Sequence, residues 1–466
     1  MPSKCLQELI SLLELNGELS RIYVPANPVL EIAGITDRVC KEPDGGRALL
    51  FEDPVGSVFK LATNIFGSKK RVCLALGIEN LDELTSTVSR LLNQIANPEL
   101  ESLGSQIAAL PEFRNFAPDS SIQSDPDLYL MESPDLTAFP FLKSWPDDGN
   151  ASGYGRYITL PQVFTTDPDG GTSNCGIYRV QIRSEREVAI RWKVRSGAAR
   201  HSEQFLQAGK AMPVAIVLGG EPATLFSAMF PLPQNLDEMT FAGFIRGARL
   251  KTALCKTLPL QVPIGAEVVI EGYVEPGETV LEGPFGNHTG FYSADGLAAV
   301  MKVTAVSHRH NAIIPATVVG MPPMEDCWMM QAWERVLFAI LRRIIPEIKG
   351  IYFPLISVFH QSGIIFLENP RPGMVRNIAL QLWSMSWFAS AKLLLFVSDE
   401  TLNTDLSSII WKSINVTDFS DDIIRDETTN RIAIDSTGCS VSSREIALSE
   451  ETLRIIATRW KEYGLA

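Results

Sequence analysis

The sequence predicts a mixed fold, in which α/β domains at both ends of the chain flank a central domain rich in β-strands. Near both termini, apolar runs of strand length alternate with helical patterns, whereas alternating polar and apolar residues mark the middle. At 466 residues, the chain is long enough for several domains. The expected parts are an N-terminal α/β domain at 1–110, a linker or surface excursion at 111–150, a β domain at 151–320 and a C-terminal α/β domain at 321–466.

The N-terminal domain is expected to begin with a helix. Ser3 can cap its first turn, apolar residues then recur at helical spacing, and Gly17 can end it. Short apolar runs follow at residues 48–51 and 72–76, and a second helical pattern lies near residues 81–95. This alternation is typical of a small α/β domain.

The central part has a different pattern. It follows a segment rich in Pro, Asp and Ser at residues 111–150. Residues 187–195 alternate polar and apolar side chains over most of their length, and residues 212–220 predict another strand that ends in glycines. Many strands with few helices predict a barrel or a sandwich.

The last third of the chain returns to an α/β pattern. A helix is expected at residues 327–345, and strand-like runs lie at 364–367 and 393–397. Pro372-Gly373 can start the helix between these two runs. The order strand, helix, strand predicts a parallel sheet.

Composition excludes several classes of protein. A net charge of −13 argues against a general nucleic-acid binder, which needs a basic face. No apolar run approaches the roughly 20 residues that span a bilayer, and Glu8 and Glu14 interrupt any signal peptide. The 7 cysteines are scattered singly, as free thiols in a reducing cytoplasm would be. The entry motifs for ATP, NAD and α/β-hydrolase chemistry are missing from the sequence.

One short run, residues 282–290, concentrates acid–base chemistry. Glu282, Asn287 and His288 are spaced there by glycines and a proline, just past the strand-like residues 267–273. Glycine and proline shape turns and let a ligand approach the backbone. The run therefore indicates an active-site wall, and the alternative is a surface hairpin with incidental polar residues.

A second run, residues 167–179, ends in a predicted strand that carries Asn174 and Arg179. Asn offers a neutral oxygen ligand for a hard cation, and Arg offers a forked donor for a carboxylate or phosphate. The alternative is a hairpin in which Asn174 caps a turn. Glu238 lies at a predicted helix start, where a carboxylate commonly only compensates the helix dipole.

Taken together, the motifs resemble those of the UbiD family of decarboxylases over nearly the whole chain. The motifs that carry the resemblance are Gly17-Glu18-Leu19, Thr63-Asn64-Ile65-Phe66-Gly67, the run 167–179, Pro231-Leu232-Pro233, Glu271-Gly272-Tyr273, the run 282–290, Pro322-Pro323, Glu325-Asp326-Cys327 and Ile434-Asp435. The resemblance implies an N-terminal α/β domain, a central split β-barrel that binds a flavin, and a C-terminal α/β domain that joins subunits.

The resemblance also implies a reaction. Such enzymes use prenylated FMN, made by a separate flavin prenyltransferase, to decarboxylate aromatic or α,β-unsaturated acids through a covalent adduct, reversibly in some members. Quinone-precursor hydroxybenzoates are the family's default substrates. The cofactor phosphate is held through a divalent metal, typically Mn²⁺, with a monovalent cation (K⁺ or Na⁺) nearby. Homo-oligomers, either dimers or trimers of dimers, are expected.

Individual residues match the family's site. Asn174 and Glu238 match two metal ligands, Arg179 matches the active-site arginine, and Glu282 matches the carboxylate that pairs with it. The residues that match segments around the cofactor are Ile177, Tyr178, Arg179, Arg191, Trp192, Ser196 and Gly197.

Three positions depart from the family pattern. The metal-binding His of a W-x-x-H arrangement is Arg195 here, and a guanidinium cannot ligate a cation. The acid that delivers a proton is Asn287 here, and an amide has no proton to give near neutral pH. A Lys that precedes the Ile-Asp motif is Arg431, which keeps its positive charge and is included among the expected cofactor-binding residues.

These departures leave two hypotheses. In the first, the chain is a working decarboxylase in which Arg195 pairs with Glu238 and neutralises the phosphate, and Glu282 or His288 supplies the proton. In the second, the chain has lost catalysis and acts as a cofactor-binding or regulatory subunit beside an active homologue. The pair of Glu282 and Arg179 favours the first hypothesis, although a structural salt bridge would also explain its presence.

Overall fold

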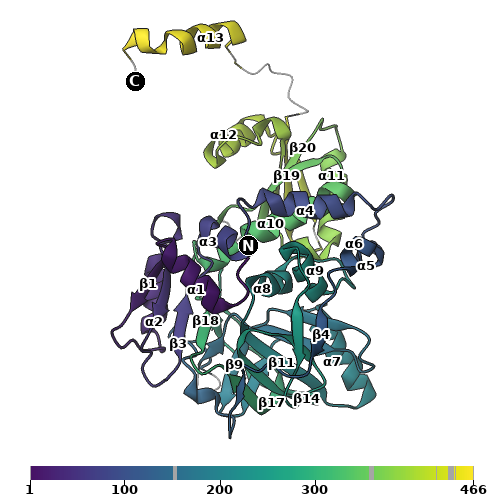
Figure 1. Cartoon of the computed structure of the whole chain (residues 1–466). Coiled ribbons are helices and arrows are strands. Elements are labelled where there is room, and N and C mark those ends of the chain that lie inside the picture. Colours follow the sequence, from purple (N-terminus) through teal and green to yellow (C-terminus); the bar gives the residue numbers. More distant parts are fainter. Residues whose placement is uncertain are drawn as a thin grey trace.

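Three larger sheets form the framework of the computed structural model, which describes residues 2–150, 155–355, 361–426, 428–438, 446 and 448–464. They have four, nine and five strands, and helices pack around each of them (Figure 1). Two smaller sheets of three and two strands accompany them. The mixed α/β class that the sequence predicts is confirmed.

The four-stranded sheet joins the start of the chain to a strand from far along the sequence. Its strands, in spatial order, are β1 (Leu19–Ile22), β2 (Ala48–Phe51), β3 (Lys60–Thr63) and β18 (Ile313–Ala316). The accompanying helices are α1 (Leu6–Leu15), α2 (Glu31–Cys40), α3 (Lys69–Leu76) and α4 (Asp82–Leu92). The predicted cap Ser3 is wrong, because Cys5 occupies the N-cap position of α1 without a side-chain bond. The apolar run at 72–76 lies inside α3.

The segment at residues 111–150 lies against the rest of the molecule. After α5 (Leu103–Ala109) and α6 (Pro111–Arg114), it contributes β4 (Asp119–Ile122) and β5 (Tyr129–Leu130). Strand β4 pairs with β12 (Lys251–Leu254), which also pairs with β13 (Gln261–Pro263). Phe139 and Phe141 are buried in the core of the central sheet. This segment therefore carries both strand pairing and core packing.

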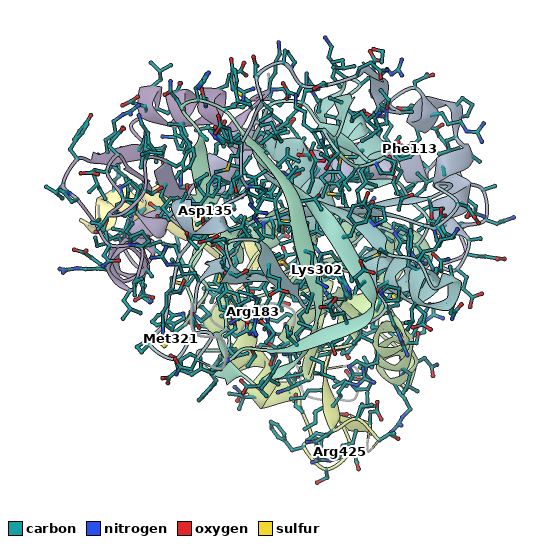
Figure 2. The ribbon with its side chains drawn as sticks, turned by 90° about the horizontal axis from the view of Figure 1, so that it is seen from below. Phe113, Asp135, Arg183, Lys302, Met321 and Arg425 are labelled. Atoms are coloured by element: carbon teal, nitrogen blue, oxygen red, sulfur yellow. The ribbon has the colours of Figure 1, made fainter. Side chains whose placement is uncertain are left out.

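The nine-stranded sheet forms the middle of the molecule. Its strands are β5, β6 (Tyr157–Ile158), β7 (Gln162–Thr166), β8 (Ser173–Gly176), β9 (Val180–Ser184), β10 (Glu187–Ile190), β11 (Met212–Gly219), β14 (Ala266–Glu282) and β17 (Gly296–His308). The long pair β14 and β17 dominates Figure 2, where Lys302 is labelled on β17. The strand predicted at 187–195 ends earlier, at Ile190, and the strand predicted at 267–273 continues as far as Glu282.

Three helices cover part of this sheet. They are α7 (Gly197–Ala208), α8 (Pro222–Met229) and α9 (Glu238–Arg246). All three contact β8 at the edge of the sheet. The two-stranded sheet, β15 (Phe285–Gly286) with β16 (Tyr292–Ser293), directly follows the end of β14. The three helices therefore lie beside β8 at one edge of the sheet, and the β15–β16 pair lies directly after β14.

The C-terminal sheet is parallel only at its centre. In spatial order it contains β19 (Ile348–Tyr352), β20 (Ser362–Leu367), β21 (Leu393–Ser398), β23 (Arg431–Ser436) and β22 (Ile423–Asp426). The edge strands β19 and β22 are antiparallel to their neighbours, so the prediction of a parallel sheet holds only for β20, β21 and β23. Helix α11 (Met374–Ser384) starts after Gly373, as predicted.

One core connects the two ends of the chain. Helix α10 (Glu325–Ile344) packs against α3 and α4 of the N-terminal part and against β19 of the C-terminal sheet. Helices α12 (Leu406–Val416) and α13 (Glu450–Arg459) follow, and no residue of α13 is buried. Figure 1 shows α13 beyond the C-terminal sheet.

Neither membrane helices nor disulfides are seen in the part of the chain that the structure describes. None of its helices combines the length and the apolar character needed to cross a bilayer. Six cysteines are free thiols, and five of them are buried. The seventh, Cys439, lies outside the described residues.

Candidate active site

A bidentate ion pair joins Arg179 to Glu282. The guanidinium donates from Nε to Oε1 at 2.8 Å and from Nη2 to Oε2 at 2.7 Å. Glu282 is the last residue of β14, and its side chain has no exposed surface. Arg179 lies in the connection between β8 and β9, so the expectation that Ile177, Tyr178 and Arg179 form a strand is wrong. Two parallel hydrogen bonds fix the plane of both groups.

A second arginine shares the same carboxylate. Arg191 Nη1 lies 3.5 Å from Glu282 Oε2 and also donates to the carbonyl oxygen of Ala294 at 3.0 Å. Arg179 and Arg191 therefore bring two positive charges to one buried negative charge. The side chains of both arginines remain partly exposed, at 19% and 38%. The cluster has a net positive charge that a ligand carboxylate would neutralise.

Further contacts orient Arg179. Its Nη1 donates to Ser293 Oγ at 2.9 Å, and that hydroxyl donates to the carbonyl oxygen of Phe285 at 3.1 Å. The guanidinium also lies 5.1 Å from the centre of the Phe285 ring, within the range of a cation–π contact. Sequence reasoning missed Ser293, because eleven positions separate it from Glu282 and only the pairing of β15 with β16 brings it back.

Two buried side chains form hydrogen bonds to the backbone of the segment that follows Glu282. Tyr157 donates its hydroxyl hydrogen to the carbonyl oxygen of Pro284 at 3.2 Å. The Asp148 carboxylate accepts the backbone N–H of Gly286 at 2.7 Å and that of Trp145 at 2.9 Å. Burial raises the pKa of both Tyr157 and Asp148. No spacing pattern in the sequence links these residues to the 282–290 run.

Asn287 and His288 lie at the turn of the same segment. Asn287 Oδ1 accepts the backbone N–H of His288 at 2.7 Å, and its own backbone N–H donates to Phe291 at 3.1 Å. His288 is partly buried, and burial lowers the pKa of its imidazole to about 4. The imidazole is therefore neutral at pH 7.

The structure brings Asn174, Glu238, Ser196 and Gly197 together at the edge of the central sheet. Asn174 lies on β8, and Glu238 is the first residue of α9, with its Oε2 accepting the backbone N–H of Cys175 at 3.1 Å. Burial raises the pKa of Glu238 to about 8. Gly197 begins α7 so close to Asn174 that a Cβ at position 197 would lie 2.0 Å from Asn174 Oδ1.

The residues before α7 complete this second cluster. Ser196 caps α7, because its Oγ accepts the backbone N–H of Ala199 at 3.2 Å. The Trp192 ring meets the Tyr178 ring edge to face, with 5.3 Å between their centres. Arg195 is exposed and makes no hydrogen bond or ion pair with any residue that the structure describes. The hypothesis that Arg195 pairs with Glu238 is therefore wrong.

The donor set at this cluster is poor for a divalent metal. Within the described ranges, no group of three or more His, Cys, Asp or Glu side chains could hold a metal ion. Asn174 and Glu238 supply two donor side chains, whereas Mn²⁺ favours octahedral oxygen coordination. One of the Glu238 oxygens already accepts a backbone N–H.

Arg431 lies in the C-terminal sheet. It forms an ion pair with Asp426 at 3.0 Å, and its guanidinium lies 5.4 Å from the centre of the Trp383 ring. Its other hydrogen bonds go to Thr429 and the Trp383 carbonyl oxygen. The contacts of Arg431 are thus with residues of the C-terminal part and not with either cluster.

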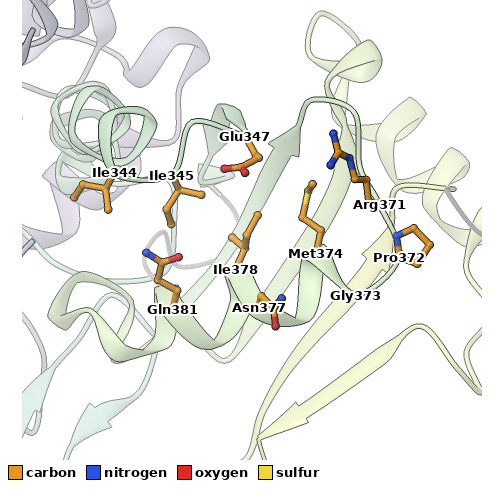
Figure 3. Close-up of a pocket in the computed structure, with 10 residues that line it drawn as sticks. All are labelled: Ile344, Ile345, Glu347, Arg371, Pro372, Gly373, Met374, Asn377, Ile378 and Gln381. Carbon is orange, nitrogen blue, oxygen red and sulfur yellow. The ribbon is translucent and has the colours of Figure 1, made fainter. Parts of the chain in front are cut away.

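A pocket of about 440 Å³ lies in the same C-terminal part. Figure 3 shows it between the end of α10, the residues that follow, and α11. Glu347 and Arg371 provide its charged groups, and Ile344, Met374 and Ile378 its apolar ones. None of the residues that line it is among the predicted site residues.

Comparison with sequence families covers most of the chain. Residues 10–91 match the 3-octaprenyl-4-hydroxybenzoate carboxy-lyase N-terminal domain, residues 121–322 its Rift-related domain and residues 327–443 its C-terminal domain. Two relatives are uncharacterized proteins. One, from Archaeoglobus fulgidus, is 36% identical over 90% of this chain and 85% of its own length. The other, from Aquifex aeolicus, is 34% identical over 98% and 93%.

Solved structures share the fold. Vanillic acid decarboxylase from Sedimentibacter hydroxybenzoicus, in its closed form, superposes with a TM-score of 0.83 at 22% identity and covers 99% of each chain. An evolved dimeric form of the UbiD-class enzyme HmfF from Pelotomaculum thermopropionicum, in complex with prenylated FMN, gives 0.79 at 23% identity, with 96% of this chain and 97% of that chain covered. At these identities the likeness shows the fold alone. Because the three family models and the two relatives cover nearly its whole length, this chain belongs to the 3-octaprenyl-4-hydroxybenzoate carboxy-lyase (UbiD) family.

Proposed function

We propose that this protein is a decarboxylase that removes carbon dioxide, non-oxidatively and reversibly, from an aromatic or α,β-unsaturated carboxylic acid. The observation that carries the proposal is the buried Glu282 carboxylate held by Arg179 and flanked by Arg191. An excess of positive charge beside a partly open site suits a substrate carboxylate. Family membership supports the same reaction class.

A flavin, either prenylated FMN or FMN, is the proposed cofactor. When bound, prenylated FMN supplies the electron sink for the loss of carbon dioxide. Asn174, Ile177, Tyr178, Arg191, Trp192, Arg195, Ser196 and Gly197 are the proposed cofactor-binding residues. We also propose the division of the chain expected from its sequence, with the nine-stranded sheet as the split β-barrel.

The chain's own residues orient the substrate and handle the proton. Arg179 binds the substrate carboxylate. Contacts with Ser293 and Phe285 keep the Arg179 guanidinium in one plane. The proton comes from Glu282, once it has taken up a proton, or from His288, since Asn287 has none to give. A low pKa leaves His288 unprotonated at pH 7. If His288 is the donor, activity therefore rises as the pH falls toward about 4.

Cofactor loading and turnover test the proposal. The full chain is co-expressed with a flavin prenyltransferase, the proposed supplier of its cofactor, and its absorption spectrum is recorded. Deuterium incorporation at the α-carbon of candidate acids then measures turnover. Glu282→Gln should abolish incorporation, whereas Glu278→Gln, at a partly exposed position on the same strand where Glu278 pairs with Lys302, should not. A colourless protein that binds neither FMN nor its prenylated form contradicts the proposal.

A second candidate function rests on Asn287. An amide at the position expected to deliver a proton favours a cofactor-binding or regulatory subunit that lacks catalysis, working beside an active homologue. The same experiment distinguishes the two functions. A subunit of this kind binds flavin but incorporates no deuterium with any acid, whereas a decarboxylase does both.

Assembly and location are also proposed. Exposed apolar side chains on α12, with Trp411 65% and Ile414 60% exposed, support a homo-oligomer, either a dimer or a trimer of dimers. The six described free thiols support a reducing cytoplasm.

A further inference from the structure

Two buried side-chain N–H donors that precede α7 in the sequence make no hydrogen bond of ordinary geometry with any described residue. Asn174 is only 7% exposed and its amide lies near the Tyr178 hydroxyl, yet its side-chain Nδ2 makes no hydrogen bond of ordinary geometry with the residues that the structure describes. The indole Nε1 of Trp192, four positions before the cap, is likewise buried without a partner. Buried donors are almost always paired in folded proteins, so two unpaired N–H groups point to a ligand that accepts hydrogen bonds.

Asn174 faces the first turn of α7. The Cβ that an alanine at position 197 would carry would lie 2.0 Å from Asn174 Oδ1 and 2.6 Å from its Cγ, so the side-chain amide abuts the helix start. Helix α7 has 12 residues, and of its first-turn N–H groups the cap Ser196 takes that of Ala199. The N–H of Ala198 lies near the Tyr178 hydroxyl, a neutral group that an anion could displace. The helix dipole makes such a terminus favourable for an anion.

The charges around the cluster favour an anion over a cation. Arg195 directly precedes the cap, is exposed and has no partner within the described ranges, so its guanidinium is available. Its backbone has a φ of 64°, which turns the chain sharply into α7. Few ligands are present for a cation, because Arg195 cannot bind one and Glu238 Oε2 already accepts the N–H of Cys175 at 3.1 Å.

We infer that this chain holds the phosphate of FMN directly, through the α7 N-terminus, Asn174 and Arg195, without a divalent metal. The inference rests on the proposed function, because it takes FMN as the ligand. The two unpaired donors and the guanidinium match the acceptor oxygens and negative charge of a phosphate. A metal bridge would need more side-chain ligands than the two, Asn174 and Glu238, that the cluster offers.

Flavin titration measures the role of the metal. The full chain, purified in EDTA, is titrated with FMN and with riboflavin by flavin fluorescence, in EDTA and in Mn²⁺. We expect the Kd for FMN to be the same in both buffers, and riboflavin to bind about tenfold more weakly or worse. An FMN affinity that falls about tenfold in EDTA overturns the inference, as does equal affinity for FMN and riboflavin.

Variants test the residues. Arg195→Ala should weaken FMN about tenfold and leave riboflavin unchanged. Lys210→Ala removes the same charge just beyond the other end of α7 and should change neither. An equal loss for both flavins in Arg195→Ala would mean that Arg195 acts on the fold, which overturns its assignment to the phosphate.

Electron paramagnetic resonance of Mn²⁺ provides a readout without flavin or activity. The free-ion signal should persist in the presence of the wild-type chain and diminish with Arg195→His, which restores a nitrogen ligand beside Asn174 and Glu238. Stoichiometric loss of the signal with the wild-type chain overturns the inference.

The outcomes separate this inference from the proposed function. If FMN binds without Mn²⁺ but the chain loaded with prenylated FMN incorporates no deuterium, the decarboxylase proposal is contradicted and metal-free binding stands. If the chain turns over but binds FMN only in Mn²⁺, metal-free binding is contradicted and the decarboxylase proposal stands. Failure of FMN to bind in either buffer overturns both.

Discussion

Glu282 and Asn287 are five positions apart, and their side chains serve different purposes. Glu282 is buried and bound by two hydrogen bonds to Arg179, so it is held in one orientation. The Asn287 amide instead uses its Oδ1 on the neighbouring backbone N–H of His288. Glu282 therefore contributes to the charge of the site, and Asn287 stabilises the turn.

Replacing Asn287 by an acid should raise activity. In Asn287→Asp a carboxylate oxygen can accept the N–H of His288 as the amide does at 2.7 Å, so the turn is preserved while an acid is added. We expect faster deuterium incorporation by the variant loaded with prenylated FMN. Unchanged or slower incorporation would count against this position as the proton-donor site. Asn287→Gln, which adds no acid, is the control.

His288 makes stability depend on pH. Burial lowers the pKa of its imidazole from 6.5 to about 4, so the unfolded chain binds a proton here before the folded chain does. The contribution to stability is fully present above pH 6.5 and is lost as the pH falls toward about 4. The free energy of unfolding, measured in urea, should therefore fall less over this range in His288→Gln than in the wild type. His310→Gln, at an exposed position, should behave as the wild type does; equal slopes for all three would contradict the burial of His288.

At the scale of elements, the site depends on where helix α7 begins and on how the β15–β16 hairpin turns back. Helix α7 begins against Asn174 of β8, and the β15–β16 pair turns Ser293 back toward Arg179. Trp145 fills the space under the hairpin, where its indole N–H donates to the carbonyl oxygen of Val319 at 2.8 Å. Backbone contacts of this kind leave little room for added atoms.

Gly286 should not tolerate alanine. A Cβ at this position would lie 2.0 Å from Trp145 Cδ1, so either the indole or the β15 backbone must move. Overpacking of this kind costs about 1–3 kcal/mol, and a displaced β15 should also lower turnover. Gly34→Ala is the matched control, since a Cβ there meets nothing within 4 Å and should be neutral or stabilising. Equal unfolding free energies for Gly286→Ala and the wild type would contradict the packing described.

At the scale of the whole molecule, α10 connects the N-terminal and C-terminal parts through one core. Helix α12 lies on the outside of the C-terminal sheet and buries only Ile409 and Ser413. Its exposed apolar side chains make a surface that a second subunit could cover.

A charge on that surface should disrupt assembly. Trp411 is 65% exposed, and Trp411→Asp should reduce the mass measured by light scattering to that of a single chain. Val58→Asp, at a position 91% exposed in the N-terminal part, should leave the mass unchanged. A wild-type protein that is already monomeric, or a Trp411→Asp variant that keeps its mass, would contradict an interface at α12.

Local pattern predicted much of this protein, because helix and strand periodicity depend on neighbouring residues. The helix starting after Gly373 and the strand from Met212 were expected from such patterns. The pairing of Arg179 with Glu282 was expected only from the family resemblance. Strand ends were less predictable. Polar and apolar residues still alternate beyond Ile190, but the chain leaves the sheet there to reach α7.

The sequence by itself determined the mixed α/β class, the resemblance to a decarboxylase family and the residue types at its site. Only the tertiary structure decided that Arg191 shares the Glu282 carboxylate, that Asp148 and Tyr157 hold the segment after it, and that Arg195 is not paired with Glu238. The physical reason is distance along the chain. These contacts join residues that strand pairing and helix packing bring together from far apart, and no local periodicity records them.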